Sequence, residues 1–185
     1  MTAVAHRPRL TLPIGGRDHI RGPESAPYVL LEYGDYQCPY CRAAQGVVEQ
    51  LLVAAGDEIR YAYRHFPLSQ IHPQAALAAE AAEAAGAQGR FWEMHELLFQ
   101  HQDRLTPHDL LGYASALRLD VQRVALELER NVHRQRVRED FLSGVRSGVN
   151  GTPTFFINGA RYDGSWEEPD LLDALELAVH AARRM

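Results

Sequence analysis

The sequence has few cysteines, little net charge and no long apolar run, and each shortage excludes a class of protein. Only 2 of the 185 residues are cysteine while 46% are hydrophobic, so the chain can bury a core and is not a disulfide-stapled mini-protein. No apolar run approaches the roughly 20 residues of a membrane-spanning helix, so we predict no membrane insertion. The formal net charge of −5 argues against nucleic acid as a partner.

One arginine-rich stretch, residues 131–138, would suit a nucleic-acid surface if taken alone. It is followed at once by Glu139 and Asp140, which places charges of both signs next to each other. We therefore interpret this stretch as a solvated helix face.

The N-terminal segment lacks the features of an export leader. It contains Arg7, Arg9 and Arg17, but no apolar core of about 7–15 residues and no small-residue cleavage site. We therefore expect a cytoplasmic location, or an exported protein if a leader has been removed.

Apolar spacing along the first third of the chain predicts a strand, a helix and a second strand. Residues 28–33 form a continuous apolar run typical of a strand buried on both faces, and residues 39–55 have helical spacing. Residues 59–66 alternate like a strand. This order predicts a right-handed βαβ unit, preceded by a short edge strand at residues 10–14.

The rest of the chain is predicted to form a series of helices, followed by a hairpin and a final helix. Helices are predicted over residues 73–87, 90–101, 107 onward, 121 onward and 132–145. Strand character returns at 154–157, and Asn158-Gly159 is a strong hairpin turn before a strand at 160–163. A final amphipathic helix is expected at 169–183. The predicted class is α/β, with the order βαβ, helical insert, ββα.

Both cysteines lie in Cys38-Pro39-Tyr40-Cys41, where the first strand gives way to the first helix. Two thiols at a helix start can close a small disulfide, and the N–H groups of the first turn favour a thiolate. Cys38 precedes the helix and can accept hydrogen bonds from the amides of Tyr40 and Cys41. We predict Cys38 as the exposed, low-pKa nucleophile and Cys41 as the more buried resolving thiol. No second pair of ligands at zinc-finger spacing is found, so no metal is predicted.

Two further residues, Glu32 and Pro153, are candidates for a role beside the cysteines. Glu32 lies inside the otherwise apolar first strand. It is either an edge residue with its carboxylate in water, or a buried acid of raised pKa that exchanges protons with Cys41. Pro153, in Gly151-Thr152-Pro153-Thr154, directly precedes an apolar strand and by itself suits an ordinary trans turn.

Several other side chains are interpreted as structural. We expect His65 and His72, which flank the exit of the second strand, to be surface or capping residues, and Asp35 to be a turn residue only. The apolar residues of 91–99 are expected to form helix core and not a substrate groove.

Residues 31–41, Leu-Glu-Tyr-Gly-Asp-Tyr-Gln-Cys-Pro-Tyr-Cys, resemble the active-site strand and helix of DsbA-like thiol–disulfide oxidoreductases of the thioredoxin superfamily. Later blocks of that family are resembled, in order, by residues 64–68, 72–73, 88–95 and 149–155. The resemblance covers about residues 19–183. It implies a thioredoxin fold with a mixed central sheet, formed by residues 1–71 and 148–185, and an inserted all-helical domain at 72–147.

The resemblance also assigns roles to residues around the cysteines. It implies that Pro153 is cis and lies against a Cys38–Cys41 disulfide, and that Glu32 is the family's buried acid. Thr152 would offer its backbone to an extended substrate segment by strand pairing. Gly151, Pro39 and Tyr40 are expected beside it as substrate-binding residues.

The predicted function is a thiol–disulfide oxidoreductase acting on protein or peptide thiols, without metal, flavin or nucleotide. Glutathione or a thioredoxin-type protein is the expected recycling partner. One alternative is a glutaredoxin, which shares Cys-Pro-Tyr-Cys but normally lacks a helical insert. Another is a chaperone-like peptide-binding module with incidental cysteines. An isomerase on the same scaffold would need a dimer.

Overall fold

The computed structural model describes residues 8–166, 170–171 and 173–175, and its centre is a five-stranded mixed sheet. The strands lie in the order β1-β3-β2-β4-β5. The central pair β2–β3 is parallel, and the other neighbours are antiparallel. Their bounds are β1 His19–Arg21, β2 Tyr28–Gly34, β3 Ile59–His65, β4 Thr154–Ile157 and β5 Ala160–Tyr162. The predicted mixed sheet and βαβ unit are therefore confirmed.

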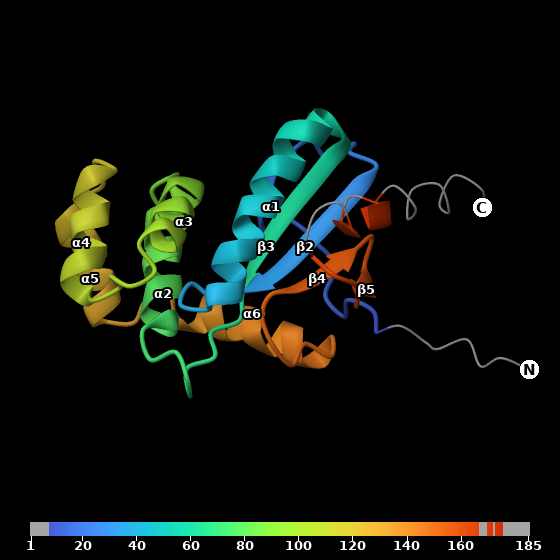
Figure 1. Ribbon diagram of the computed structural model, residues 1–185. Helices are drawn as coiled ribbons and strands as arrows, with labels where there is room; N and C mark the ends of the chain where they lie inside the picture. The colour runs from blue at the N-terminus through green and yellow to red at the C-terminus, as the bar shows by residue number, and fades with distance from the viewer. Residues whose placement is uncertain (1–7, 167–169, 172, 176–185) are drawn as a thin grey trace, which may run out of the picture.

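The helices have three positions relative to the sheet: α1 crosses one face, α2 to α5 form a group at its side, and α6 packs back against it (Figure 1). The helix after β2, α1, crosses one face of the sheet, while α2 to α5 stand together at its side. The next helix along the chain, α6, packs against both α2 and β3. The bounds are α1 Pro39–Ala55, η1 Gly56–Glu58 (a 3-10 turn), α2 Ala75–Gly86, α3 Phe91–Gln100, α4 Pro107–Ala116, α5 Val121–Glu129 and α6 Arg134–Arg146.

Local chemistry at the helix starts explains why these helices begin where the sequence predicted. Thr106 caps α4 by accepting from the backbone N–H of Asp109, whose carboxylate accepts from the Thr106 N–H in return. Asp120 caps α5 by accepting from the Arg123 N–H at 3.0 Å. Each cap satisfies backbone donors that the first helical turn leaves without a partner.

Two apolar clusters cover the two faces of the sheet. One contains Leu31, Tyr33, Phe66 and Phe156, with Phe141 of α6 packed against it. The other runs from the opposite sheet face through α1 into the helical insert without a break, and its members include Leu30, Val48, Leu51, Ala82, Met94, Leu98 and Leu110. The predicted core role of 91–99 is thereby confirmed at Phe91, Met94, Leu98 and Phe99. The domain boundaries at 72 and 147 stay a prediction.

The edge strand predicted at residues 10–14 is wrong, because these residues form no strand and the edges of the sheet are β1 and β5. Arg64 donates to the backbone carbonyl oxygens of Leu12 (2.9 Å) and Pro13 (3.1 Å), so a side chain uses the acceptors that a strand ladder would need. Pro13 also has no N–H to give. Next to the segment, Arg9 forms an isolated bridge with Ala160, and the N–H of Leu10 donates to the carbonyl of Gly159 at 2.9 Å.

The C-terminal helix predicted at 169–183 falls mainly outside the described residues. Residues 170–171 and 173–175 are helical, and Leu171 and Leu175 are buried in the cluster that contains α1. Among the residues that the structure describes, no helix combines the length and apolarity needed to cross a membrane.

Candidate active site

The two cysteines lie at the carboxyl end of β2, where a tight turn leads into α1. Cys38 is the N-cap residue of α1 with extended backbone angles, and Pro39 occupies the first helical position. The N–H of Cys38 donates to the carbonyl of Asp35 at 3.1 Å, which closes the turn. The Cys38 sulfur therefore lies at the leading, positive end of the helix.

The environment separates the two thiols electrostatically. A hydrogen bond from the Cys41 thiol is the largest influence on Cys38 and, with Thr152 and the amides of Cys41 and Tyr40, lowers its pKa to about 5 against the opposing effect of burial. Burial, above all, raises the pKa of Cys41 well above its ordinary value, and the charges of Glu32 and Cys38 act in the same direction. This asymmetry supports Cys38 as the nucleophile and Cys41 as the resolving thiol.

Cys38 is not the exposed residue that the sequence predicted, since only 3% of its surface is accessible. The loop before β4 lies beside it, and its Sγ is 3.4 Å from the carbonyl oxygen of Thr152. Cys41 is fully buried. Both are free thiols in this structure, so the disulfide between them stays a prediction for the oxidised protein.

Glu32 is buried, and its interpretation as an exposed edge residue is wrong. It lies on β2, between β3 and β4, so the sheet leaves its strand no open edge. The hydroxyl of Tyr61 donates to its Oε2 at 2.7 Å, while Oε1 has no partner among the described residues. Burial raises the pKa of Glu32 to about 8, although the Tyr61 hydrogen bond opposes the shift. A carboxyl group of this kind can both hold and accept a proton near neutral pH.

The residues assigned to substrate binding surround the Cys38 sulfur. The peptide bond between Thr152 and Pro153 is cis. The carbonyl of the preceding Gly151 accepts from the Thr154 hydroxyl at 2.7 Å, which holds the loop against β4. On the other side of the sulfur Pro39 and Tyr40 are exposed, Tyr40 with 66% of its surface. The structure thus places Gly151 and Thr152, in the loop before β4, close to Pro39 and Tyr40, in the first turn of α1.

Asp35 does far more than form a turn. Its Oδ1 accepts from the Gln37 N–H at 2.7 Å, and its Oδ2 accepts from the Leu68 N–H and from His72 Nδ1, each at 2.8 Å. Its own N–H donates to Cys41 Sγ at 3.4 Å. The buried carboxylate thus joins the active-site turn to the loop after β3. His72 is a partner of this carboxylate and not a free surface residue.

Gln102, which no sequence pattern singles out, binds the active-site turn from the helical insert. Its Nε2 donates to the carbonyl oxygens of Tyr36 (2.9 Å) and Cys38 (2.7 Å). A second link runs through His95, which is fully buried and lies 3.0 Å from the Tyr36 hydroxyl and 3.2 Å from Gln45 on α1. Burial holds the pKa of His95 well below its ordinary value, so the ring is neutral.

Replacing Gln102 with Leu should destabilise the protein by about 1–3 kcal/mol, because two carbonyl groups lose their side-chain donor. Urea unfolding of the variant and the wild type would measure the difference. Gln100→Leu is the matched control, since Gln100 is exposed at the end of α3. Equal stability of the Gln102 and Gln100 variants would contradict this role for Gln102.

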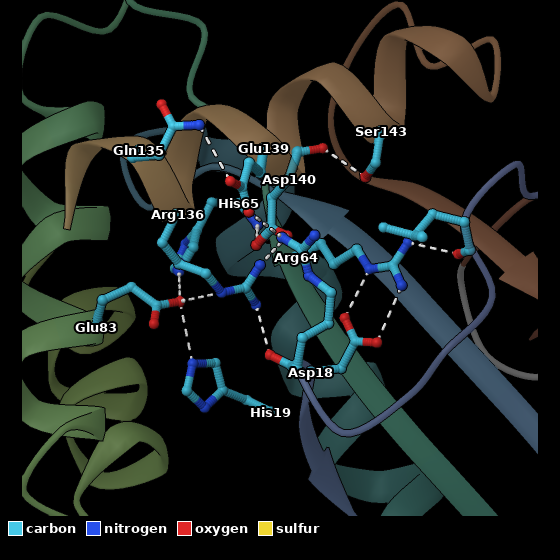
Figure 2. Close-up of polar contacts among 12 residues, drawn as sticks. Asp18, His19, Arg64, His65, Glu83, Gln135, Arg136, Glu139, Asp140 and Ser143 are labelled. Atoms are coloured by element: carbon cyan, nitrogen blue, oxygen red, sulfur yellow. Dashed lines mark hydrogen bonds and ion pairs between the residues drawn. The ribbon is translucent and has the colours of Figure 1, made fainter.

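A second polar cluster joins β1, β3, α2 and α6 (Figure 2). His19 Nε2 and His65 Nε2 lie 3.0 and 2.9 Å from the same oxygen of Glu83, and since a carboxylate only accepts, both rings donate. Burial alone would raise the pKa of Glu83, but these two hydrogen bonds hold it well below its usual range. His65 is therefore buried and paired, and its interpretation as a surface residue is wrong.

The same cluster contains the one group of side chains, among the described residues, that could hold a metal ion by spacing, namely His65, Glu83 and Asp140. Asp140 is already bound by the guanidinium groups of Arg136 and Arg17. Two adjacent cations and two donating rings leave no excess negative charge for a divalent ion. We interpret the cluster as the polar joint between the sheet and the insert.

Comparison with known proteins agrees with this geometry. The thioredoxin family model matches residues 15–176. BdbD from Bacillus subtilis superposes with a TM-score of 0.80 at 20% identity, covering 89% of this chain and 94% of that one. A thioredoxin-like oxidoreductase from Silicibacter pomeroyi gives a TM-score of 0.77 at 28% identity, covering 89% and 93%. These likenesses confirm the predicted thioredoxin fold.

Curated relatives with higher sequence identity have a different kind of name. The Na(+)/H(+) antiporter NhaA 1 of Salinispora arenicola is 51% identical over 166 residues, which are 90% of this chain but 25% of the relative. The chain therefore spans about a quarter of the length of the curated relatives that it matches. Such antiporters contain a segment closely similar to this chain.

Proposed function

Because the chain belongs to the thioredoxin family and has a DsbA-like fold, we propose that it is a thiol–disulfide oxidoreductase acting on protein or peptide thiols. The observation that carries the proposal is the Cys38 sulfur, which has a pKa of about 5 at the start of α1 and lies against the carbonyl of Thr152. At pH 7 such a thiol is about 99% thiolate, against about 3% for an unperturbed one.

The proposed reaction balances in two exchanges. The Cys38 thiolate attacks one sulfur of a substrate disulfide, forms a mixed disulfide and releases the other substrate sulfur as a thiolate. Cys41 then loses its proton, attacks the Cys38 sulfur and releases the second substrate thiolate, so that the substrate is reduced and the Cys38–Cys41 pair is oxidised. In the opposite direction a substrate thiolate attacks the Cys38–Cys41 bond.

Glu32 is the proposed proton acceptor for Cys41. With a pKa of about 8 it is partly ionised at neutral pH, and its charge acts directly on the Cys41 thiol. We propose further that the backbone of Thr152 pairs with an extended substrate segment, flanked by Gly151, Pro39 and Tyr40. The expected cytoplasmic location and the recycling partner, glutathione or a thioredoxin-type protein, stay predictions.

The test compares reduction of an insulin-type disulfide substrate by the wild type, Cys38→Ser and Cys41→Ser. We expect Cys38→Ser to lose activity by at least 1,000-fold, in line with the loss of a covalent nucleophile. Cys41→Ser should form the mixed disulfide but fail to release it, which mass spectrometry would detect. Activity that survives Cys38→Ser would remove the proposal.

The rival functions make different predictions on the same variants. A glutaredoxin would turn over glutathione mixed disulfides with saturation and would not need the protein substrate. A chaperone-like module would suppress client aggregation equally well in the Cys38→Ser, Cys41→Ser double variant.

A second candidate function is a redox module that works with a sodium/proton antiporter. The observation that favours it is the 51% identity to a segment of an antiporter, at a level far above that of the solved oxidoreductases. It predicts that ion exchange by an NhaA-type antiporter in inverted vesicles changes when the protein is added, and that the double cysteine variant has no effect.

A further inference from the structure

A groove of about 870 Å³ lies between the loop after β3, helix α2 and helix α6. In the view of Figure 1 the loop after β3 lies below α2, and α6 lies beside α2. Its apolar lining includes Pro67, Leu68, Ile71, Leu77, Val137 and Phe141. Ile71 leaves 69% of its surface exposed there, although it is one of the most hydrophobic side chains.

The groove lies next to the reactive sulfur by two independent connections. Asn150 lines it and is two residues before Thr152, whose carbonyl is 3.4 Å from Cys38 Sγ. Two residues of extended chain span about 7 Å. On the other side, the N–H of Leu68 is bound by Asp35, whose own N–H donates to Cys41 Sγ. A polypeptide paired with Thr152 therefore reaches the groove within a few residues.

The groove also has a charge pattern. Arg134 and Arg138 lie one helical turn apart on α6 and both line it. Among the described residues neither has a carboxylate within 4.0 Å, whereas Arg136, on another face of the helix, is bound to Asp140. The one acid in the lining is Glu80, where burial raises the pKa and opposes the effect of Arg134. The groove thus presents two guanidinium groups, and in the described part of the chain neither is in ion-pair contact with a carboxylate.

We propose that this groove binds the segment of a client polypeptide that flanks the reacting cysteine, and that it selects apolar segments carrying an acidic side chain, which pairs with Arg134 and Arg138. Guanidinium groups suit this role because they bind carboxylates through two parallel hydrogen bonds. The inference deepens the proposed function, on which it rests, by naming a substrate class.

The test uses two peptides with the same apolar core and the same cysteine, each joined by a disulfide to a small chromogenic thiol. One carries two Glu residues on the flanks and the other carries two Lys residues. We expect the wild type to release the chromogenic thiol from the Glu peptide with about 5-fold higher kcat/KM, mainly through KM, as two partly exposed ion pairs imply. The R134E/R138E variant should reverse this preference.

The matched control is R130E/R146E, which changes the net charge equally at two exposed arginines outside the groove. It should keep the wild-type preference. Equal rates on both peptides in the wild type, or the same reversal in the control, would overturn the inference.

A small symmetrical aromatic disulfide without flanking residues distinguishes failure of the groove proposal from failure of the proposed redox function. If the wild type and both arginine variants reduce this disulfide at the same rate but do not distinguish the two peptides, the groove proposal fails and the redox function stands. If Cys38→Ser reduces it as fast as the wild type, the redox function itself fails.

Discussion

In the reduced protein, Cys38 should titrate with a midpoint near pH 5 and react as a thiolate at all higher pH values. At pH 7 its thiolate fraction should exceed that of an ordinary cysteine by about 30-fold. The cause is the set of donors around the sulfur, in which the Cys41 thiol and the amides of the first helical turn stabilise the negative charge. Ultraviolet absorbance of the thiolate, followed from pH 3 to pH 9, would measure the midpoint.

The control for this titration is Cys38→Ser, which leaves Cys41 as the single cysteine. Because the pKa of Cys41 is raised well above its ordinary value, this variant should show no thiolate absorbance below about pH 9. A wild-type midpoint near 8.5 would show that the helix start does not activate the sulfur, and the proposed mechanism would lose its nucleophile.

The same shift makes the stability of the reduced protein depend on pH. Since the folded-state pKa of Cys38 lies below that of the unfolded chain, its contribution is complete above about pH 8.5. It declines as the pH falls and is gone below about pH 5. The oxidised protein has no thiolate to stabilise. The reduced form should therefore lose stability relative to the oxidised form over this interval.

Replacing Arg64 with Met should lower the free energy of unfolding by about 3–5 kcal/mol. The side chains of Arg64 and Asp18 are both fully buried, and the guanidinium Nε donates to Asp18 at 2.7 Å (Figure 2). Arg64 also binds the Tyr33 hydroxyl and two backbone carbonyls of the N-terminal segment. Its loss leaves the Asp18 carboxylate buried without its cation, which is the costly half of a broken pair.

Chemical unfolding would test this value against two controls. Arg60→Met, on the same strand but in no ion pair within the described part of the chain, should change stability by less than about 1 kcal/mol. Adding Asp18→Asn to the Arg64→Met variant should recover part of the loss, because the uncompensated charge is then removed. A single Arg64 variant as stable as wild type would show that this buried pair contributes nothing.

Local patterns were sufficient to predict most of the framework. The apolar run of β2, the alternation of β3 and the Asn158-Gly159 turn each encode their element within a few residues. The start of α1 at Pro39 follows from proline at the first helical position, and the start of α4 at Pro107 follows from the Thr106 cap; both signals are equally local. The cysteine pair at a strand–helix junction was sufficient to locate the candidate site, because its position alone places both sulfurs near backbone amides.

What the sequence could not provide are contacts between distant segments. Gln102 binds the Cys38 carbonyl across 64 positions, and Asp35 binds His72 across 37, so no window of periodicity contains either pair. The burial of Cys38 depends on the Thr152 loop, 114 positions away. The surface position predicted for His65 and the strand predicted around Pro13 are wrong for the same reason, because their partners come from α2 and from Arg64.

The hydrogen bonds of Gln102 couple the position of the helical insert to the backbone of the redox pair. Gln102, two residues past the end of α3, donates to the carbonyl of the nucleophile itself, so a small shift of this part of the insert would change the position of the amides that face the sulfur. Related proteins could thus acquire different redox potentials by altering residues on the insert, while Cys-Pro-Tyr-Cys stays unchanged. A comparison of such proteins that considers only the dipeptide between the cysteines would therefore miss this effect on the redox potential.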